Sequence, residues 1–156
     1  MTQRWLLAAA LTLAACGGNA TSSVAQNRQP EPAANAEAAV QQFLEAVADS
    51  NLAKMAELWG TAKGSAARTG QPNDYERRII IMQAYLRDRR HRLMSNAQDG
   101  ADANRRIVQV EFRRGDCVKT VPFTVIRSEP GDWLVNSIDL ALLGGPDGNC
   151  DENADG

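Results

Sequence analysis

IVQVEFRRGDCVKTVPFTVI, residues 107–126, has the strongest structural signal in this chain of 156 residues. Every second position in each half of the segment is apolar: Val108, Val110 and Phe112, then Val121, Phe123 and Val125. Alternation of apolar and polar residues is typical of strands with one buried face and one solvated face. Because Arg114-Gly115-Asp116 lies between the two halves and favours a turn, we expect an antiparallel hairpin here.

Further strands are expected on both sides of this hairpin. Residues 129–132, Glu-Pro-Gly-Asp, favour a turn, and Trp133–Leu140 then predicts a third strand. Upstream, His91–Ala97 is a weaker candidate for a fourth strand. Pro122 suggests that its strand lies at a sheet edge or contains a bulge, because proline donates no backbone hydrogen bond.

The N-terminal half instead has the three- and four-residue apolar spacing of amphipathic helices. One helix is expected over residues 33–49 and a shorter one over 52–59. After a loop over 60–73, Asn73 and Glu76 have capping-box spacing and predict the start of a third helix. Helices followed by an antiparallel meander indicate the α+β class, with N-terminal helices packed on a sheet of three to four strands.

Two segments resemble a known superfamily: FLEAVADSNLAKMAELW at Phe43–Trp59 and GDWLVNSIDL at Gly131–Leu140. Together with the order of the elements, they make about residues 35–142 similar to the nuclear transport factor 2-like superfamily. The resemblance implies a curved, cone-like sheet wrapped on the helices, with a conical pocket inside. That superfamily contains small isomerases and hydrolases as well as non-catalytic binding and scaffolding modules, so the fold alone assigns no function.

The N-terminus has the layout of a secretory signal peptide, with Arg4 followed by an apolar run from Trp5 to Ala15. The run is too short to span a bilayer as a helix. Leu13-Ala14-Ala15-Cys16 resembles the lipobox of bacterial lipoproteins. That resemblance implies a diacylglycerol group on the Cys16 thiol, cleavage of residues 1–15, and acylation of the new N-terminus, with palmitate as an expected chain. The alternative is an ordinary signal peptide with a coincidental cysteine.

The chain after the cleavage site divides into three parts. Residues 16–32 are expected to be a lipidated, flexible tether, because they contain almost no apolar side chains. Residues 33–142 form the α+β domain, and residues 143–156 an acidic, Gly-rich tail. Gly17 and Gly18 stand where an Asp would retain a lipoprotein in the inner membrane of some bacteria. The resemblance therefore implies a lipid anchor in the bacterial cell envelope, at the outer membrane.

Composition limits the classes of partner. Removal of residues 1–15, whose only charge is Arg4, leaves 16 of the 17 basic side chains against 19 acidic ones. This balance argues against a nucleic-acid partner. Residues 61–114 nevertheless have a net charge of +6 and residues 115–156 of −6. Mutual neutralisation of the two segments is the favoured explanation, and a cationic face for envelope phosphate or carboxylate groups is the other.

Cys117 and Cys150 are the cysteines that remain after Cys16, an even pair in a chain exported to an oxidising compartment. We expect one disulfide between them. It would close a loop of about 34 residues, to which the chain-entropy model assigns roughly 3–4 kcal/mol. Because neither cysteine has a CxxC partner or a histidine at ligand spacing, a structural role is favoured over a redox or metal role.

No catalytic constellation stands out in the sequence. His91 is the only histidine in the sequence, and the arginines around it are expected to lower its pKa. The sequence has no GxSxG nucleophile motif with which a histidine base could act. Enzymes of the similar superfamily use a carboxylate or tyrosine inside the cone. Residues of those types here are Tyr75, Tyr85, Asp88, Glu111 and Asp139, and none has a partner at diagnostic spacing. No metal or cofactor is expected, since residues 151–156 match only the first half of a calcium-binding loop.

Four aromatic residues are the best candidates for the core or for a pocket wall: Trp59, Tyr75, Phe112 and Trp133. The expected function is a membrane-anchored, non-catalytic binding domain for a small apolar ligand or an envelope protein. One alternative is an isomerase- or hydrolase-like enzyme that uses the same conical pocket, which requires a buried carboxylate or tyrosine facing it. Another is a structural lipoprotein without a ligand.

Overall fold

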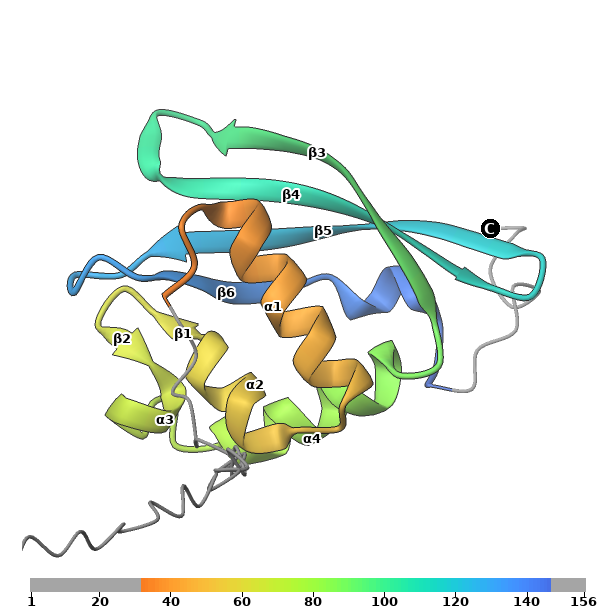
Figure 1. Cartoon of the computed structure of the whole chain (residues 1–156), viewed down its shortest axis with the longest axis horizontal. Coiled ribbons are helices and arrows are strands. Elements are labelled where there is room, and N and C mark those ends of the chain that lie inside the picture. The colour runs from red at the N-terminus through yellow and green to blue at the C-terminus, as the bar shows by residue number, and fades with distance from the viewer. Residues whose placement is uncertain (1–31, 147–156) are drawn as a thin grey trace, which may run out of the picture.

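The computed structural model describes residues 32–146, in which the helices lie against one side of an antiparallel sheet (Figure 1). The helices are α1 (Ala36–Ala48), α2 (Leu52–Leu58), α3 (Ala66–Thr69) and α4 (Tyr75–Leu86), with the 3-10 helix η1 (Leu140–Leu143). The strands are β1 (Gly60–Thr61), β2 (Gly64–Ser65), β3 (Arg90–Asp99), β4 (Asp102–Arg114), β5 (Cys117–Arg127) and β6 (Trp133–Ile138). This arrangement confirms the predicted α+β class.

The main sheet pairs its strands antiparallel in the order β3-β4-β5-β6. β4 and β5 form the predicted hairpin, with Arg114 opposite Cys117 across the turn. Gly115 in this turn has φ +57°, a left-handed conformation that favours glycine. The weaker prediction over residues 91–97 is also confirmed, because β3 covers them and pairs with β4.

The hydrophobic core lies between α1 and the inner face of the sheet. The alternating apolar residues of the hairpin are at most 1% exposed: Val108, Val110, Phe112, Val121, Phe123 and Val125. Val40 and Phe43 of α1 are fully buried in the same cluster. The rings of Phe112 and Phe123 stack with their centroids 6.0 Å apart. Side chains therefore occupy the space between α1 and the middle of the sheet.

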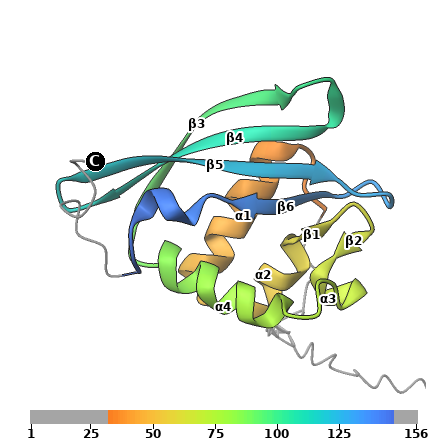
Figure 2. The same cartoon turned by 180° about the vertical axis from the view of Figure 1, so that it is seen from behind.

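The remaining helices complete the layer beside α1, and Figure 2 shows α4 next to η1. The chain leaves α2 at Trp59, whose backbone is extended and forms a parallel bridge with Val135 of β6. The side chain of Asn136 donates a hydrogen bond to the carbonyl of Gly60 at 2.8 Å. These contacts attach the end of α2 and the small β1–β2 sheet to the edge of the main sheet.

Two local predictions are wrong. Residues 60–73, expected to be a loop, contain β1, β2 and α3, which are too short to give a detectable apolar period. The predicted capping box at Asn73 does not form, since its side chain accepts a hydrogen bond from Gln71 at 3.0 Å. α4 instead starts after Asp74, whose carboxylate pairs with Arg78 one turn later at 2.9 Å.

The sequence predicts that the acidic tail starts at residue 143. The packed domain instead continues past residue 142. Leu143 is 3% exposed and belongs to the core. Arg89 donates a hydrogen bond to the carbonyl of Gly145 at 3.1 Å, and Arg114 donates to that of Pro146 at 2.7 Å. The domain therefore reaches at least Pro146, because both the apolar contact and these donors hold the segment.

Other predictions concern residues outside the described range. They are the cleaved segment 1–15, the lipidation residue Cys16, the tether up to residue 31, and Cys150. The disulfide between Cys117 and Cys150 accordingly stays a prediction. Within residues 32–146, no helix has both the length and the apolar character required to cross a membrane.

Candidate functional site

The structure separates the four aromatic candidates. Phe112 lies in the core, 1% exposed, and Tyr75 is partly buried at the start of α4 with its hydroxyl 3.4 Å from the Glu76 carboxylate. Trp59 and Trp133 line two different surface clefts. The four side chains therefore do not form one pocket, and the two tryptophans indicate where ligands could enter.

The cleft at Trp59, called the Trp59 cleft below, lies between α4 on one side and β6 with η1 on the other. Its volume is about 370 Å³, within the range of roughly 300–1,000 Å³ that is usual for small-molecule sites. Its apolar lining consists of Trp59, Ile81, Met82, Ile138 and Leu140. Figure 2 shows the three elements that form it, with α4 in green and η1 in blue.

The indole N–H of Trp59 is the most informative polar group in this cleft. Trp59 is 6% exposed, and its Nε1 atom is buried without a hydrogen-bond partner among residues 32–146. A buried donor without a partner costs about 1–3 kcal/mol. Because the N–H is buried, a ligand acceptor in the cleft recovers that energy only when the side chains that cover the N–H move.

Charges lie at the rim of the Trp59 cleft, on the first turns of α4. Asp74 and Arg78 form an ion pair, Oδ1 to Nε 2.9 Å, and this contact holds the pKa of the Asp74 carboxyl below its usual value. Arg77 also lines the cleft but forms no hydrogen bond or ion pair within the described part of the chain. One carboxylate and two guanidinium groups leave the rim with a net charge of +1.

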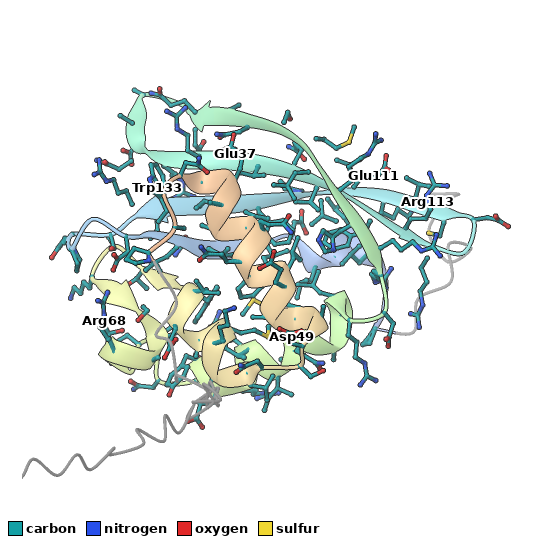
Figure 3. The ribbon with its side chains drawn as sticks, in the orientation of Figure 1. Glu37, Asp49, Arg68, Glu111, Arg113 and Trp133 are labelled. Carbon is teal, nitrogen blue, oxygen red and sulfur yellow. The ribbon has the colours of Figure 1, made fainter. Side chains whose placement is uncertain are left out.

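The cleft at Trp133 is larger, about 440 Å³, and lies where the described chain begins at Pro32 and Ala33. Arg68 and Asp132, which both line it, form an ion pair at 3.0 Å. Figure 3 labels Arg68 and Trp133 at the same end of the molecule. Glu57 also lines this cleft and forms no described ion pair, which leaves the cleft with a net charge of −1, opposite in sign to that of the Trp59 cleft.

The candidate acid–base residues do not converge. Glu111 pairs with Arg92 at 3.2 Å and, as the alternation of β4 requires, points to the opposite face from Phe112. Asp88, which pairs with Arg87 at 3.7 Å, and Asp139 are both exposed. In the described residues there is no group of three or more His, Cys, Asp and Glu side chains that could hold a metal ion.

His91 lies on the inner side of β3, with its ring centroid 6.3 Å from that of Phe112. Burial lowers the pKa of its imidazole, and the negative charge of Glu45 opposes this effect. The prediction of a lowered pKa is thus correct in direction, but burial is its main cause and the neighbouring arginines are not.

The arginines of residues 87–92 do not form one cationic face. Arg89 is only 8% exposed and donates to the carbonyl of Tyr85 at 2.8 Å as well as to Gly145. Its burial, together with the nearby charge of Arg114, lowers the pKa of its guanidinium. Among the described ion pairs, Arg68–Asp132 is the one that joins the cationic segment 61–114 to the anionic segment 115–156.

Most of the Trp59 cleft could not be predicted from the sequence pattern, which indicates no role for Arg77, Arg78, Ile81 or Asn136. The available signal was the Ile80-Ile81 pair, which lies off the buried stripe of α4 and leaves two apolar side chains 55% and 39% exposed.

We compared the chain with protein-family models, with curated proteins and with solved structures, and no match was found in any of the three comparisons. The assignment of a function therefore depends on the geometry and chemistry of the clefts.

Proposed function

We propose that this chain is a lipid-anchored protein of the bacterial cell envelope whose domain binds a small apolar ligand without catalysis. The anchor is Cys16, supported by the signal-peptide layout and by the Leu13-Ala14-Ala15-Cys16 lipobox. The tether carries the domain away from the membrane, which is expected to be the outer membrane. The proposal includes no cofactor and no catalytic residue.

The proposed fold is that of the nuclear transport factor 2-like superfamily, with a curved, cone-like sheet. The order of helices and strands supports this assignment. The middle of such a cone would contain Phe43, Phe112 and Phe123, which are fully or almost fully buried. We therefore place the ligand in the Trp59 cleft at the side of the domain, instead of between α1 and the sheet.

The observation that most supports binding is the buried Trp59 N–H without a partner, beside an apolar cleft of about 370 Å³. Apolar walls with a few oriented polar groups are the usual composition of a small-molecule site. The dispersion of the candidate carboxylates and of His91 over different faces supports binding over an isomerase or hydrolase activity.

The anchor is tested by expressing the full chain in a bacterium and measuring its intact mass after extraction from membranes in mild detergent. We expect a chain that starts at Cys16 and carries a diacylglyceryl group and a further acyl chain. The Cys16→Ser variant should lose these additions. An unmodified chain in the soluble fraction would contradict the anchor.

Binding is tested by native mass spectrometry of the same membrane-extracted protein. An added mass that survives gentle ionisation is expected, and it would identify the occupant. The Met82→Trp variant, which fills the Trp59 cleft, should lose that mass, whereas Val118→Trp on the exposed side of the hairpin should keep it. A bare protein mass would favour the alternative of a structural lipoprotein without a ligand.

An exposed apolar patch favours an envelope protein as a second candidate partner. Leu52, Ile80 and Ile81 are 40%, 55% and 39% exposed. The side chain of Gln83 donates to the hydroxyl of Ser50 at 3.2 Å, which brings this part of α4 next to the start of α2. Crosslinking from position 80 in intact cells would identify such a partner, and no crosslink above that of a position-118 control would exclude this second candidate.

A further inference from the structure

We infer that the ligand of the Trp59 cleft is a small amphiphile with an apolar body and one anionic acceptor group, such as a carboxylate. This inference rests on the proposed binding function and specifies its ligand class. It is drawn from the polar groups that lie without partners at the cleft, and from the charge of its rim.

The first argument is the direction of the hydrogen bonds that the cleft offers. Trp59 and Arg77 both line the cleft. The buried indole N–H of Trp59 and the exposed guanidinium of Arg77 have no hydrogen-bond partner among residues 32–146. Both groups can only donate. A ligand that satisfies them must therefore present acceptor atoms, and a ligand whose polar group is an ammonium cannot do so.

The second argument is charge. Arg78 is paired with Asp74 at 2.9 Å, so these two charges compensate each other at the rim. Arg77 is left with its charge uncompensated by any described ion pair, and its guanidinium can bind a carboxylate with two parallel hydrogen bonds. The rim thus favours a single negative charge on the ligand.

The third argument is the apolar lining, which comes from both sides of the cleft. Ile81, Met82, Ile138 and Leu140 line the cleft, and Met82 is 6% exposed. Methionine has a flexible side chain that adapts to the shape of an apolar ligand. Asp74, Arg78, Asn136 and Ser137 also line the cleft, but Asp74 and Arg78 pair with each other and the Asn136 amide donates to Gly60. One unpaired positive charge beside aliphatic side chains fits an amphiphilic acid.

The test uses the mature-length chain, residues 16–156 with Cys16→Ser so that it stays water-soluble; it contains every described residue. Three probes with the same ten-carbon chain are titrated by calorimetry: decanoate, decanol and decyltrimethylammonium. Decanoate should bind about 10-fold more tightly than decanol, because a charged acceptor makes stronger hydrogen bonds than a neutral one. The cationic probe should bind more weakly than either.

Two variants assign the preference to named groups. Arg77→Gln should weaken decanoate about 3-fold and leave decanol unchanged, as expected for an exposed charge pair. Trp59→Phe should weaken decanoate about 10-fold while keeping an aromatic wall. Arg90→Gln, an exposed arginine on β3, and Trp133→Phe, in the other cleft, are the matched controls and should change neither affinity.

Equal affinity for decanoate and decanol, or an Arg77→Gln variant with unchanged decanoate affinity, would overturn the inference but leave an apolar binding site in place. Absence of binding by all three probes would also overturn it. The proposed function would fail separately, through a bare protein mass in the native spectrum of the membrane-extracted chain.

Discussion

Trp59 and Phe112, both candidates for the core or for a pocket wall, have different positions in the structure. Phe112 alternates with polar residues in β4 and packs on Phe123, so its burial follows directly from the period of the strand. Trp59 follows α2 in an extended conformation and lines a cleft together with residues of α4 and β6. Its surroundings are therefore set by elements far along the chain, which local sequence patterns do not reveal.

Truncation of Phe112 tests its assignment to the core. Phe112→Ala should lower the free energy of unfolding by about 3–5 kcal/mol, because it removes a buried aromatic ring and leaves a cavity in the core. The control Val118→Ala, on the same hairpin but 42% exposed, should change it by no more than about 0.5 kcal/mol. Urea unfolding measures both. A Phe112→Ala variant of normal stability that loses ligand binding would instead place Phe112 in a pocket wall.

His91 predicts a pH dependence of stability. Burial lowers its pKa in the folded state below the unfolded value of 6.5. As the pH falls through 6.5 towards the folded pKa, the unfolded chain takes up a proton that the folded chain resists, so stability decreases. Urea unfolding between about pH 7.5 and 5.5 should show this decrease in the native chain and a smaller one in His91→Gln. The same slope in both proteins would rule out His91 as its source.

At the scale of elements, prediction succeeded where a period extends over several residues. The long β4–β5 hairpin and the buried stripe of α4 could be read from spacing alone, whereas β1 and β2 have two residues each. Of the two alternatives that Pro122 predicts, the edge strand is wrong, because β5 lies inside the sheet. The bulge agrees with a register shift in the β5–β6 ladder between Thr124 and Val125. The ladder ends at Phe123 opposite Ile138, so the proline lies just beyond it.

Helix caps give a prediction at this scale. The Asn35 side chain accepts a hydrogen bond from the backbone N–H of Ala38 at 2.8 Å and caps α1. Asn35→Ala should therefore cost about 1 kcal/mol of stability. Asn73→Ala should cost less than about 0.5 kcal/mol, because Asn73 caps no helix despite its spacing from Glu76. If thermal unfolding showed the same loss of stability for both variants, Asn73 would cap α4 as its spacing from Glu76 predicts.

At the scale of the whole molecule, the clefts are the features that sequence patterns could least predict. The Trp59 cleft joins the end of α2, one face of α4 and the end of β6, which are separated by up to 80 residues in the sequence. The opposite net charges of residues 61–114 and 115–156 can be counted in the sequence. Which side chains pair across the two segments cannot, and among the described ion pairs Arg68–Asp132 is the one that does so. The positions of both features depend on packing of elements that are distant in the chain.

The predicted disulfide also belongs to this scale. Arg114, opposite Cys117 in the hairpin, donates to the carbonyl of Pro146, and four residues from there to Cys150 can span up to about 14 Å. We expect an intact mass about two daltons below that of the reduced chain. Replacement of both cysteines by alanine should cost roughly 3–4 kcal/mol of stability. A mass equal to that of the reduced chain would contradict the bridge.

The central claim is that a ligand enters the Trp59 cleft and accepts a hydrogen bond from its indole N–H. The chain over residues 16–156 contains two tryptophans, Trp59 and Trp133, so its ¹H–¹⁵N spectrum resolves one indole signal for each cleft. Addition of decanoate should move the Trp59 indole signal downfield, because its buried N–H gains an acceptor, and leave that of Trp133 in place. An unchanged Trp59 signal, or a shift confined to Trp133, would contradict the claim.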